Sequence, residues 1–365
     1  MAVHLDRLAR VAYDYSMADP ISPASPAAAA PPVRVTTQQR YVNDLVALAQ
    51  QLLTDETSVG DLKIATGVLK EMRDAFKMFA PFRGVRKVSA FGSARTQAGD
   101  PVFRLAEELA RRMADAGFMV ITGAGPGIME ACQRGAGRDR SFGINIRLPF
   151  EQSANAVISG DPKLMHFKYF FTRKLFFVKE ADAVVLFPGG FGTHDEGFET
   201  LTLLQTGKTQ PIPLVFLDRP RGRYWKAWQR YVEDHVLRRG MIAPEDLALY
   251  KVTDSVDAAV QEIVNFYRVY HSSRYVRERF VIRLARVLPD DYVRTLAAEF
   301  GDITVDGVLE QRSAFSVERN EAHIFHLPRL VLRFDRMHFG RLRALIDRIN
   351  AAPMAGPPAP SPAAR

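Results

Sequence analysis

Cysteine is almost absent from this sequence: Cys132 is the single one among 365 residues. One thiol cannot form a disulfide within the chain, so we expect a fold held by packing alone and a reducing, cytoplasmic location. Cys132 lies in a stretch with helical spacing. We interpret it as a buried, unreactive thiol rather than a nucleophile.

Long apolar runs are also missing. No stretch reaches the roughly 20 residues that a membrane-spanning helix needs. In the first 17 residues Arg and Asp interrupt short apolar pieces, so the continuous apolar core of a secretory signal is lacking. Hydrophobic residues still make up 47% of the chain, enough to bury a sizeable core in more than one domain. We therefore expect no membrane partner.

The sequence has a net charge of +8, but no run of one sign stands out. A basic balance suits either nucleic acid or an anionic small molecule. A single-stranded nucleic-acid binder would need aromatic residues that stack on bases in a basic groove. The aromatic residues near the motifs below are predicted to be buried on a helix, so nucleic acid is not the expected partner.

The most informative stretch is residues 188–196, with the sequence PGGFGTHDE. The apolar run 183–187 before it predicts a buried parallel strand, and the residues after it recur with helical spacing. Three glycines allow positive φ and bring backbone N–H groups close to a ligand. A helix N-terminus adds further donors and the positive end of its dipole. This arrangement predicts a phosphate-binding loop.

Thr193 and Glu196 have the spacing of a capping box, with Thr193 as the predicted N-cap of the helix. From the residues alone two interpretations stay open: the pair only caps the helix, or it also serves a ligand. Asp195 should lie about 100° around the helix from Glu196. We interpret it as a solvated acid that favours the helix dipole.

Two more glycine loops follow predicted strands. Residues 92–95 (GSAR) follow the strand 86–91, and for Arg95 a phosphate or ribose contact and a solvated loop arginine are equally open. Residues 123–127 (GAGPG) follow the strand 118–122. The third glycine there comes one residue too early for a dinucleotide fingerprint, so an NAD site is excluded.

The pattern Pro-Gly-Gly-x-Gly-Thr-x-x-Glu resembles the signature of the LOG family, also labelled lysine decarboxylase-like, and Arg173-Lys174 resembles its second motif. The resemblance runs from about residue 88 to about residue 267. It implies a Rossmann-like, doubly wound parallel sheet. It also implies hydrolysis of the N-glycosidic bond of a nucleoside 5′-monophosphate, such as AMP or a cytokinin riboside monophosphate, and a homo-dimer or higher homo-oligomer with the site near the interface.

The resemblance also implies roles for individual residues. Glu196 would hold the ribose hydroxyls or water and stabilise the developing ribosyl cation, and Arg173 would orient Glu196 or help the base to leave. We expect no metal ion and no cofactor, because no pattern indicates the reactive lysine that literal lysine decarboxylation with a pyridoxal cofactor would need. The expected substrate-binding residues are Gly92, Ser93, Arg95, Gly123, Gly125, Gly127, Pro188, Gly189, Gly190, Gly192 and Thr193.

At two places the sequence differs from the family pattern, and at Lys174 the role of the residue is not predicted. Ala124 stands where the family usually has the middle one of three glycines. Met165-His166 lies further from Arg173 than in plant-type members, and Lys174 is expected to point away from Arg173. Residues 161–179 are predicted as one helix, on which Arg173 shares a face with Tyr169, Phe170 and Phe177.

The rest of the chain suggests several parts. Strand and helix patterns alternate up to residue 267, which predicts an α/β sheet with helices on both faces. After residue 272 the pattern indicates a small α+β domain, with a ferredoxin-like one as one possibility and either a regulatory or an oligomer-forming role. Two amphipathic helices between 36 and 79 are expected to pack on the core. The predicted organisation is a linker or disordered segment (1–35), an N-terminal helical segment (36–85), a nucleotide-binding domain (86–272), a small α+β domain (273–350) and a disordered tail (351–365).

One alternative is a protein of the same fold that has no catalytic activity. A non-catalytic nucleotide or cofactor carrier would bind tightly without turnover, and the presence of both Arg173 and Glu196 argues against it. The released base is not determined, because a phosphate loop is the same for every nucleobase.

Overall fold

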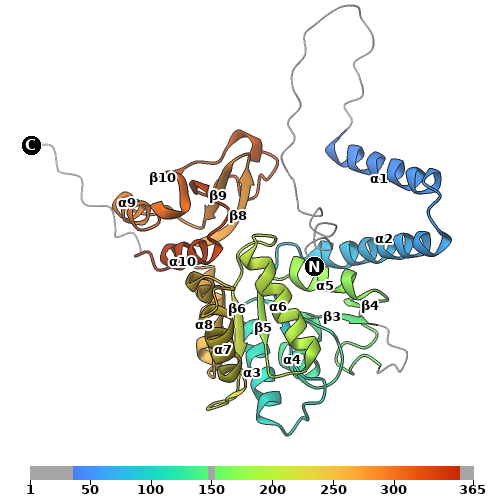
Figure 1. The fold of residues 1–365 in the computed structure, drawn as a ribbon. Coiled ribbons are helices and arrows are strands. Elements are labelled where there is room, and N and C mark those ends of the chain that lie inside the picture. The colour runs from blue at the N-terminus through green and yellow to red at the C-terminus, as the bar shows by residue number, and fades with distance from the viewer. Residues whose placement is uncertain (1–35, 147–152, 354–365) are drawn as a thin grey trace, which may run out of the picture. The chain divides into compact units, whose positions relative to one another are not determined.

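The computed structural model describes residues 36–146 and 153–353 (Figure 1). The predicted linker at 1–35 and nearly all of the predicted tail lie outside these residues. The described part divides into two compact units, 36–77 and 78–353, and each is considered by itself. Among the described helices, none combines the length and apolar character needed to cross a membrane.

The first unit contains helix α1 (Thr37–Thr54) and most of helix α2 (Val59–Phe79). Thr36 caps α1, with its hydroxyl accepting a hydrogen bond from the Gln39 N–H at 3.1 Å. No residue of α1 is buried. The expectation that both helices pack on the core stays a prediction, since an apolar stripe predicts a helix but does not specify what covers it.

The second unit is built on a seven-stranded sheet in the order β4-β3-β2-β1-β5-β6-β7, and every neighbouring pair is parallel (Figure 1). The predicted doubly wound parallel sheet is thus confirmed. Its strands are buried along their length at the centre, as sequences covered by helices on both faces require. The strands are β1 (Lys87–Phe91), β2 (Met119–Thr122), β3 (Ser141–Ile146), β4 (Leu164–Phe167), β5 (Ala183–Leu186), β6 (Leu214–Leu217) and β7 (Lys251–Thr253).

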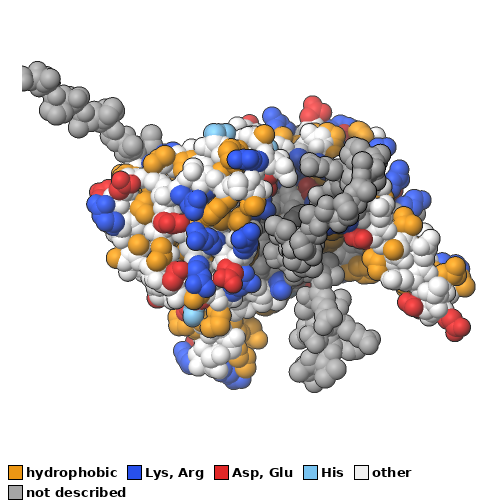
Figure 2. All heavy atoms as spheres, turned by 90° about the horizontal axis from the view of Figure 1, so that it is seen from above, with side chains coloured by type: hydrophobic (Ala, Val, Ile, Leu, Met, Phe, Trp, Pro, Cys, Tyr) orange, Lys and Arg blue, Asp and Glu red, His pale blue; other side chains and the backbone are white. Residues whose placement is uncertain are grey.

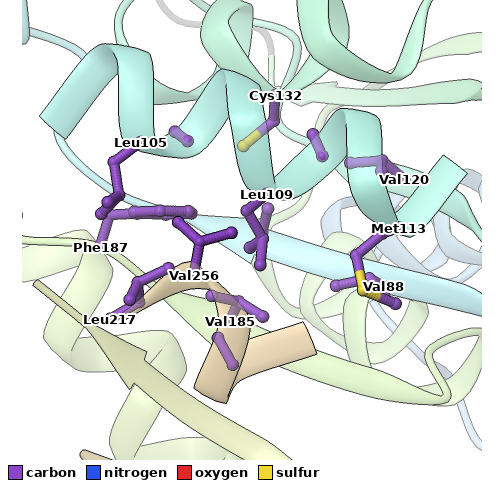
Figure 3. Close-up of a cluster of buried hydrophobic side chains, with 14 of the residues drawn as sticks. Val88, Leu105, Leu109, Met113, Val120, Cys132, Val185, Phe187, Leu217 and Val256 are labelled. Carbon is purple, nitrogen blue, oxygen red and sulfur yellow. The ribbon is translucent and has the colours of Figure 1, made fainter. Parts of the chain in front are cut away.

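Helices cover this sheet: α3 (Pro101–Asp115), α4 (Ile128–Ala136), α5 (Phe170–Lys179), α6 (Phe191–Gln205), α7 (Tyr224–Tyr231) and α8 (Val256–Phe266). The apolar side of α3 is buried, and Leu109 and Met113 meet Val88 and Val185 of the central strands (Figure 3). Cys132 lies in the same cluster, fully buried, and burial raises the pKa of its thiol. This environment supports its interpretation as an unreactive packing residue.

The prediction of one helix over residues 161–179 is wrong. Leu164–Phe167 forms strand β4, which pairs in parallel with β3 through Met165 opposite Ile144 and His166 opposite Asn145. Helix α5 begins only at Phe170. A short apolar and aromatic run has no periodicity that separates strand from helix, so pairing with β3 decides the outcome.

A second, antiparallel sheet follows, in the order β10-β11-β9-β8, as expected for an α+β arrangement. Its elements are β8 (Tyr270–Val276), β9 (Arg279–Leu284), α9 (Asp290–Glu299), β10 (Thr304–Arg312), β11 (Arg329–Phe334) and α10 (Phe339–Asn350). The ferredoxin-like possibility is wrong, because the connection is β-β-α-β-β-α and not β-α-β-β-α-β. Strand β8 has no counterpart in the sequence prediction, since its hairpin turn, Arg277-Glu278, lacks the usual Gly or Asn although Arg277 has φ 55°.

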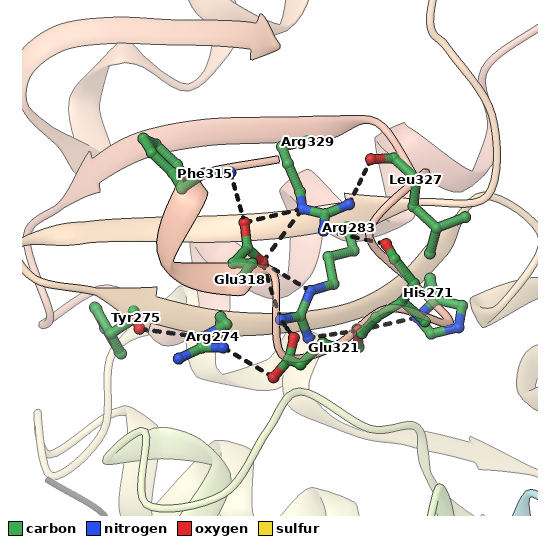
Figure 4. Close-up of polar contacts among 11 residues, drawn as sticks. His271, Arg274, Tyr275, Arg283, Phe315, Glu318, Glu321, Leu327 and Arg329 are labelled. Carbon is green, nitrogen blue, oxygen red and sulfur yellow. Dashed lines mark hydrogen bonds and ion pairs between the residues drawn. The ribbon is translucent and has the colours of Figure 1, made fainter. Parts of the chain in front are cut away.

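Charged side chains of both signs lie in the interior of the second sheet and on the molecular surface. Inside the second sheet, Glu318 is fully buried between Arg283 and Arg329 (Figure 4). On the face shown in Figure 2, Lys and Arg side chains are interspersed with acidic and apolar ones. The positive net charge is thus spread over that face, in line with its spread along the sequence.

Helices α3 and α4 approach each other so closely that only glycine fits at residue 135. A Cβ atom there would lie 2.0 Å from the carbonyl oxygen of Glu107. We expect Gly135→Ala to lower the free energy of unfolding by roughly 1–3 kcal/mol, because backbone must move apart. Urea unfolding measures this. Gly99→Ala is the control: a Cβ there meets nothing within 4 Å, so it should be neutral or slightly stabilising, and equal midpoints for all three proteins would contradict the close approach.

Candidate functional site

The candidate site lies where the winding of the parallel sheet reverses. From β1 the chain adds β2, β3 and β4 on one side, and then returns to place β5 on the other side of β1. In doubly wound sheets, ligands bind at the carboxyl ends of the strands beside such a reversal. The three glycine loops singled out in the sequence follow β1, β2 and β5, so the topology brings them to this one edge.

Backbone hydrogen bonds join the three loops. The Ser93 N–H donates to the Pro188 carbonyl at 3.2 Å, and the Ser93 carbonyl accepts from the Ile128 N–H at 3.1 Å. A Cβ on Gly127 (φ 68°) would lie 2.4 Å from the Ser93 oxygen, and one on Gly189 would lie 2.1 Å from Thr193 Oγ1. Glycine is therefore required at residue 127 for the loops after β1 and β2 to meet, and at residue 189 for the loop after β5 to turn into α6.

Helix α6 begins earlier than the sequence predicts. Its N-cap is Gly190, in an extended conformation, and no side chain makes a capping hydrogen bond. The N–H groups of Thr193 and His194 both donate to the Gly190 carbonyl, at 3.0 and 3.2 Å. The prediction of Thr193 as the N-cap of a capping box with Glu196 is therefore wrong, because the glycines continue directly into the first helical turn. The interpretation that Thr193 and Glu196 only cap the helix falls with it.

Glu196 lies one turn after Thr193 on the buried side of α6, and only 4% of it is exposed. Its Oε2 atom is buried without a hydrogen-bond partner. Burial raises the pKa of this carboxyl group to about 7, and the positive charges of Lys174 and Arg173 only partly oppose that effect. A carboxyl group near half ionisation at neutral pH can either hold or accept a proton.

Arg173 lies on α5, with its guanidinium over the rings of Phe170 and Phe177 at 5.0 and 5.4 Å. This confirms the shared helical face predicted for these residues. Its Nη1 lies 3.9 Å from the place a Cβ on Gly123 would take, and its Nε is buried without a partner. Burial lowers the pKa of the guanidinium, and the charges of Glu196 and Asp195 oppose that shift.

Lys174 points to a different set of partners from Arg173, as expected. Its ammonium group forms ion pairs with Asp195 and Glu199, both at 2.7 Å, and so ties α5 to α6. Burial works against its charged form, but these two carboxylates raise the pKa of Lys174 above its ordinary value. Asp195 is therefore more than a solvated acid: it also forms an ion pair with Lys174, whose positive charge acts on Glu196.

Other predicted residues stand apart from this arrangement. Arg95 is exposed. Its described hydrogen bonds are made by its own backbone, whose N–H donates to Ser93 Oγ at 3.1 Å. Met165 and His166 lie on the edge strand β4, with β3 and β2 between them and β1. The structure therefore does not bring Met165 and His166 to the strand ends that carry the glycine loops.

The expectation that the aromatic residues of this segment are buried is wrong at two positions. Phe170 and Phe171 are 51% and 56% exposed, whereas Phe176 and Phe177 are buried. The first turn of α5 directs its two phenylalanines away from the sheet, while the second turn faces it. Apolar surface is thus present beside Arg173.

Sequence reasoning missed the residues that hold the glycine loops from outside. Asn155 donates from its backbone N–H to the Ala124 carbonyl and from Nδ2 to the Gly125 carbonyl, each at 2.9 Å. Ala124 has φ 61°, which alanine rarely adopts. Its N–H donates to Thr122 Oγ1 at 3.0 Å, so both of its backbone polar groups are held in this strained conformation. Nothing in a single sequence links Asn155 to a loop some thirty residues earlier.

Fold and loop geometry together define a doubly wound α/β protein with three joined glycine loops at the reversal of its sheet. Residues 129–263 match the family described as "Possible lysine decarboxylase". The label is the one the LOG family also carries, so the resemblance predicted from the motifs is confirmed over this stretch, which includes Arg173, Lys174 and the loop before α6. Comparison with curated proteins gave no match.

Solved structures with a similar fold were also found. One is the molybdenum cofactor binding protein from Rippkaea orientalis, 16% identical, with a TM-score of 0.35 over 48% of this chain and 94% of that chain. Another is the molybdenum cofactor carrier protein from Chlamydomonas reinhardtii, 18% identical, with the same coverage and TM-score. A third is DNA processing protein A from Helicobacter pylori, 13% identical, with a TM-score of 0.33 over 50% of this chain and 82% of that chain.

The raised pKa of Glu196 predicts a pH dependence of stability. Its value of about 7 exceeds the ordinary 4.5, so between these values the folded protein binds a proton that the unfolded chain releases. The contribution of Glu196 to stability should therefore fall as pH rises from 4.5 through 7. Glu196→Gln cannot titrate, so its stability relative to wild type should rise between pH 5 and pH 8 by up to about 3 kcal/mol.

Urea unfolding of both proteins at the two pH values measures this difference. Asp195→Asn is the matched control, because it changes the neighbouring acid, whose side chain is 58% exposed. It should not gain stability with pH in the same way. A stability difference between Glu196→Gln and wild type that stays constant with pH would show that Glu196 titrates normally.

Proposed function

We propose that this protein hydrolyses the N-glycosidic bond of a nucleoside 5′-monophosphate to a free base and ribose 5-phosphate. The observation that carries the proposal is a pair of buried, unpartnered atoms of opposite charge type, Arg173 Nε and Glu196 Oε2, on helices that flank three joined glycine loops. Buried polar atoms are almost always satisfied, so two orphans at the carboxyl edge of a parallel sheet favour a polar ligand between them.

The glycine loops suit the phosphate group of such a substrate. The first N–H groups of a helix have no partner within it, and no side chain caps α6. These donors and the positive end of the helix dipole favour a phosphate beside Gly190 and Gly192. The loop after β2 approaches the same place through its contact with Ser93. The phosphate thus anchors the ribose near the second turn of α6, where Glu196 lies.

Glu196 and Arg173 would then act on the ribose and the base. As the bond from C1′ to the base nitrogen breaks, positive charge develops on the ribosyl ring, and an ionised Glu196 stabilises it. Water adds its oxygen to C1′ and supplies the proton that the departing base nitrogen takes up. Arg173 orients the carboxylate, since each group lies close enough for its charge to shift the pKa of the other.

A product assay tests the reaction. The purified protein is incubated with AMP, GMP, CMP, UMP and an N6-modified AMP, and free base and ribose 5-phosphate are measured. We expect release from at least one purine nucleotide, with AMP or N6-modified AMP preferred. Glu196→Gln should lower the rate at least ~100-fold, because it cannot carry the negative charge that the transition state needs.

The control is Asp115→Asn, which makes the same kind of chemical change at an exposed acid at the end of α3 and should retain most of the rate. Nucleotide binding without any base release would contradict the hydrolase and favour a non-catalytic nucleotide carrier. Equal rates for Glu196→Gln and wild type would remove Glu196 from the mechanism.

We further propose that the protein forms a homo-dimer or a higher homo-oligomer next to this site. Helices α5 and α6, joined by Lys174, expose five large apolar side chains: Phe170, Phe171, Leu175, Phe191 and Phe198, which are between 38% and 95% exposed. Several large apolar side chains on one pair of helices favour an interface, since monomeric proteins rarely expose extensive apolar patches. A second copy of this chain is the occupant that the family resemblance implies.

Sedimentation velocity measures the oligomeric state. We expect wild type to sediment as a dimer or larger, and Phe171→Glu to shift it towards the monomer, because a carboxylate would be buried in the interface. Val305→Glu is the control, since Val305 is 61% exposed on strand β10 of the antiparallel sheet. A monomeric wild type at all concentrations would contradict this proposal.

A further inference from the structure

Two side chains outside the proposed reaction form contacts at the glycine loop that follows β5. The Tyr224 hydroxyl donates a hydrogen bond to the carbonyl oxygen of Gly189. The Nε2 atom of His194 lies 2.6 Å from that hydroxyl oxygen. Tyr224 is the first residue of α7, and His194 belongs to the first turns of α6. The glycine loop is therefore linked to a side chain from a different strand–helix unit.

The protons of this chain of contacts can be assigned by elimination. A carbonyl oxygen only accepts, and the tyrosine hydroxyl has one hydrogen, which its contact with Gly189 uses. The His194 Nε2 atom must therefore carry a hydrogen and donate it to the Tyr224 oxygen. The direction of donation runs from His194 through Tyr224 to Gly189, and each donor makes the next hydroxyl or carbonyl contact stronger.

Tyr224 is itself held firmly. Its backbone N–H donates to Asp218 Oδ2 at 2.9 Å, and Asp218 is 5% exposed at the end of β6. Gly222 leaves room for that carboxylate, because a Cβ on it would lie 2.2 Å from Asp218 Cγ. The Tyr224 ring also meets the Trp225 ring edge-on, with centroids 4.7 Å apart. The hydroxyl is thus positioned by β6 and not by the loop it contacts.

Holding the Gly189 carbonyl also sets the direction of the next amide. In a trans peptide the C=O of one residue and the N–H of the following residue point in opposite directions. With the Gly189 carbonyl directed at Tyr224, the Gly190 N–H points away from Tyr224. Gly190 is the N-cap of α6, where donors for an anion are needed. Without such a restraint, two successive glycines would sample many conformations.

We propose that Tyr224 and His194 are positioning residues, which fix the Gly189–Gly190 peptide so that its N–H faces the phosphate of a phosphate monoester. The inference rests on the proposed function, because it assumes that the loop holds the 5′-phosphate. Neither residue touches the reacting bond. Their loss should weaken phosphate binding and raise KM, and leave kcat nearly unchanged.

Calorimetric titration with ribose 5-phosphate tests the positioning role directly. Tyr224→Phe, which removes only the hydroxyl, should weaken binding roughly tenfold, the loss expected for one hydrogen bond together with a less ordered loop. His194→Phe leaves the Tyr224 hydroxyl in place without its donor and should weaken binding about threefold. His194→Gln, whose amide can donate in place of Nε2, should restore most of the affinity. Tyr231→Phe, at an exposed tyrosine on the same helix, is the matched control and should bind like wild type.

The same proteins are then assayed with the nucleotide that wild type cleaves fastest, and their thermal midpoints are compared. KM should rise in step with the dissociation constant of ribose 5-phosphate, with kcat changed less than about threefold. Unchanged ribose 5-phosphate binding by Tyr224→Phe, or equal losses in His194→Gln and His194→Phe, would overturn the positioning role. If Tyr224→Phe does not fold, the two His194 variants still decide.

Failure of the proposed function gives a different result. A wild-type protein that binds ribose 5-phosphate but releases no base from any nucleotide would refute the hydrolase, while the order of affinities among the variants would still support the positioning role. A wild-type protein that binds no ribose 5-phosphate would overturn the positioning role, whether or not it releases base.

Discussion

Burial of the Glu196 carboxyl group without a hydrogen-bond partner is the constraint on which the proposed site depends, because an unsatisfied polar group costs free energy that packing elsewhere must offset. The chain contains a contrasting case in Glu318, which is equally buried (Figure 4). Burial works against its charge too, but the Phe315 N–H and the guanidinium groups of Arg329 and Arg283 donate to it, and its pKa falls below the ordinary value. One glutamate is satisfied by hydrogen bonds and joins two strands of a sheet, whereas the other keeps a buried oxygen without a partner, which supports the proposed ligand site.

The topology of the sheet places the helix that carries this carboxyl group directly after the glycine loop at the end of β5. Among the described loops, those at the ends of β1, β2 and β5 bring their glycines together, because the winding reverses between β1 and β5. Glycine allows this approach but leaves the peptides free to turn, so their directions must come from outside the loops. Asn155 fixes the carbonyls of Ala124 and Gly125, and Tyr224 fixes that of Gly189. In both loops, a residue distant in sequence therefore holds the carbonyl groups. The N–H group of each held peptide points away from that residue.

The sequence predicted what local pattern controls and missed what pairing controls. The buried strands, the three loops and the shared face of Arg173 with Phe170 and Phe177 follow from runs, glycines and helical spacing, and they are seen in the structure. The start of α6 was misplaced, because Thr193 has the chemistry of an N-cap but Gly190 takes that position. Strand β4 depends on its pairing with β3. The contact of Tyr224 with Gly189 depends on the position of α7, which follows β6 in the sheet. Such long-range contacts leave no periodic signal in a single sequence.

The antiparallel sheet is joined to the helix that carries Glu196. The Phe339 ring of α10 occupies the space left by Gly207, two residues beyond the end of α6, where a Cβ would lie 2.0 Å from the ring. Arg343, on the same helix, forms ion pairs with Glu262 of α8 and with Asp347. Helix α10 therefore contacts the parallel-sheet part through both shape and charge. Helix α6 thus has the glycine loop before its first residue and the Phe339 ring close to its last, so α10 packs against the end of α6 opposite to the candidate site.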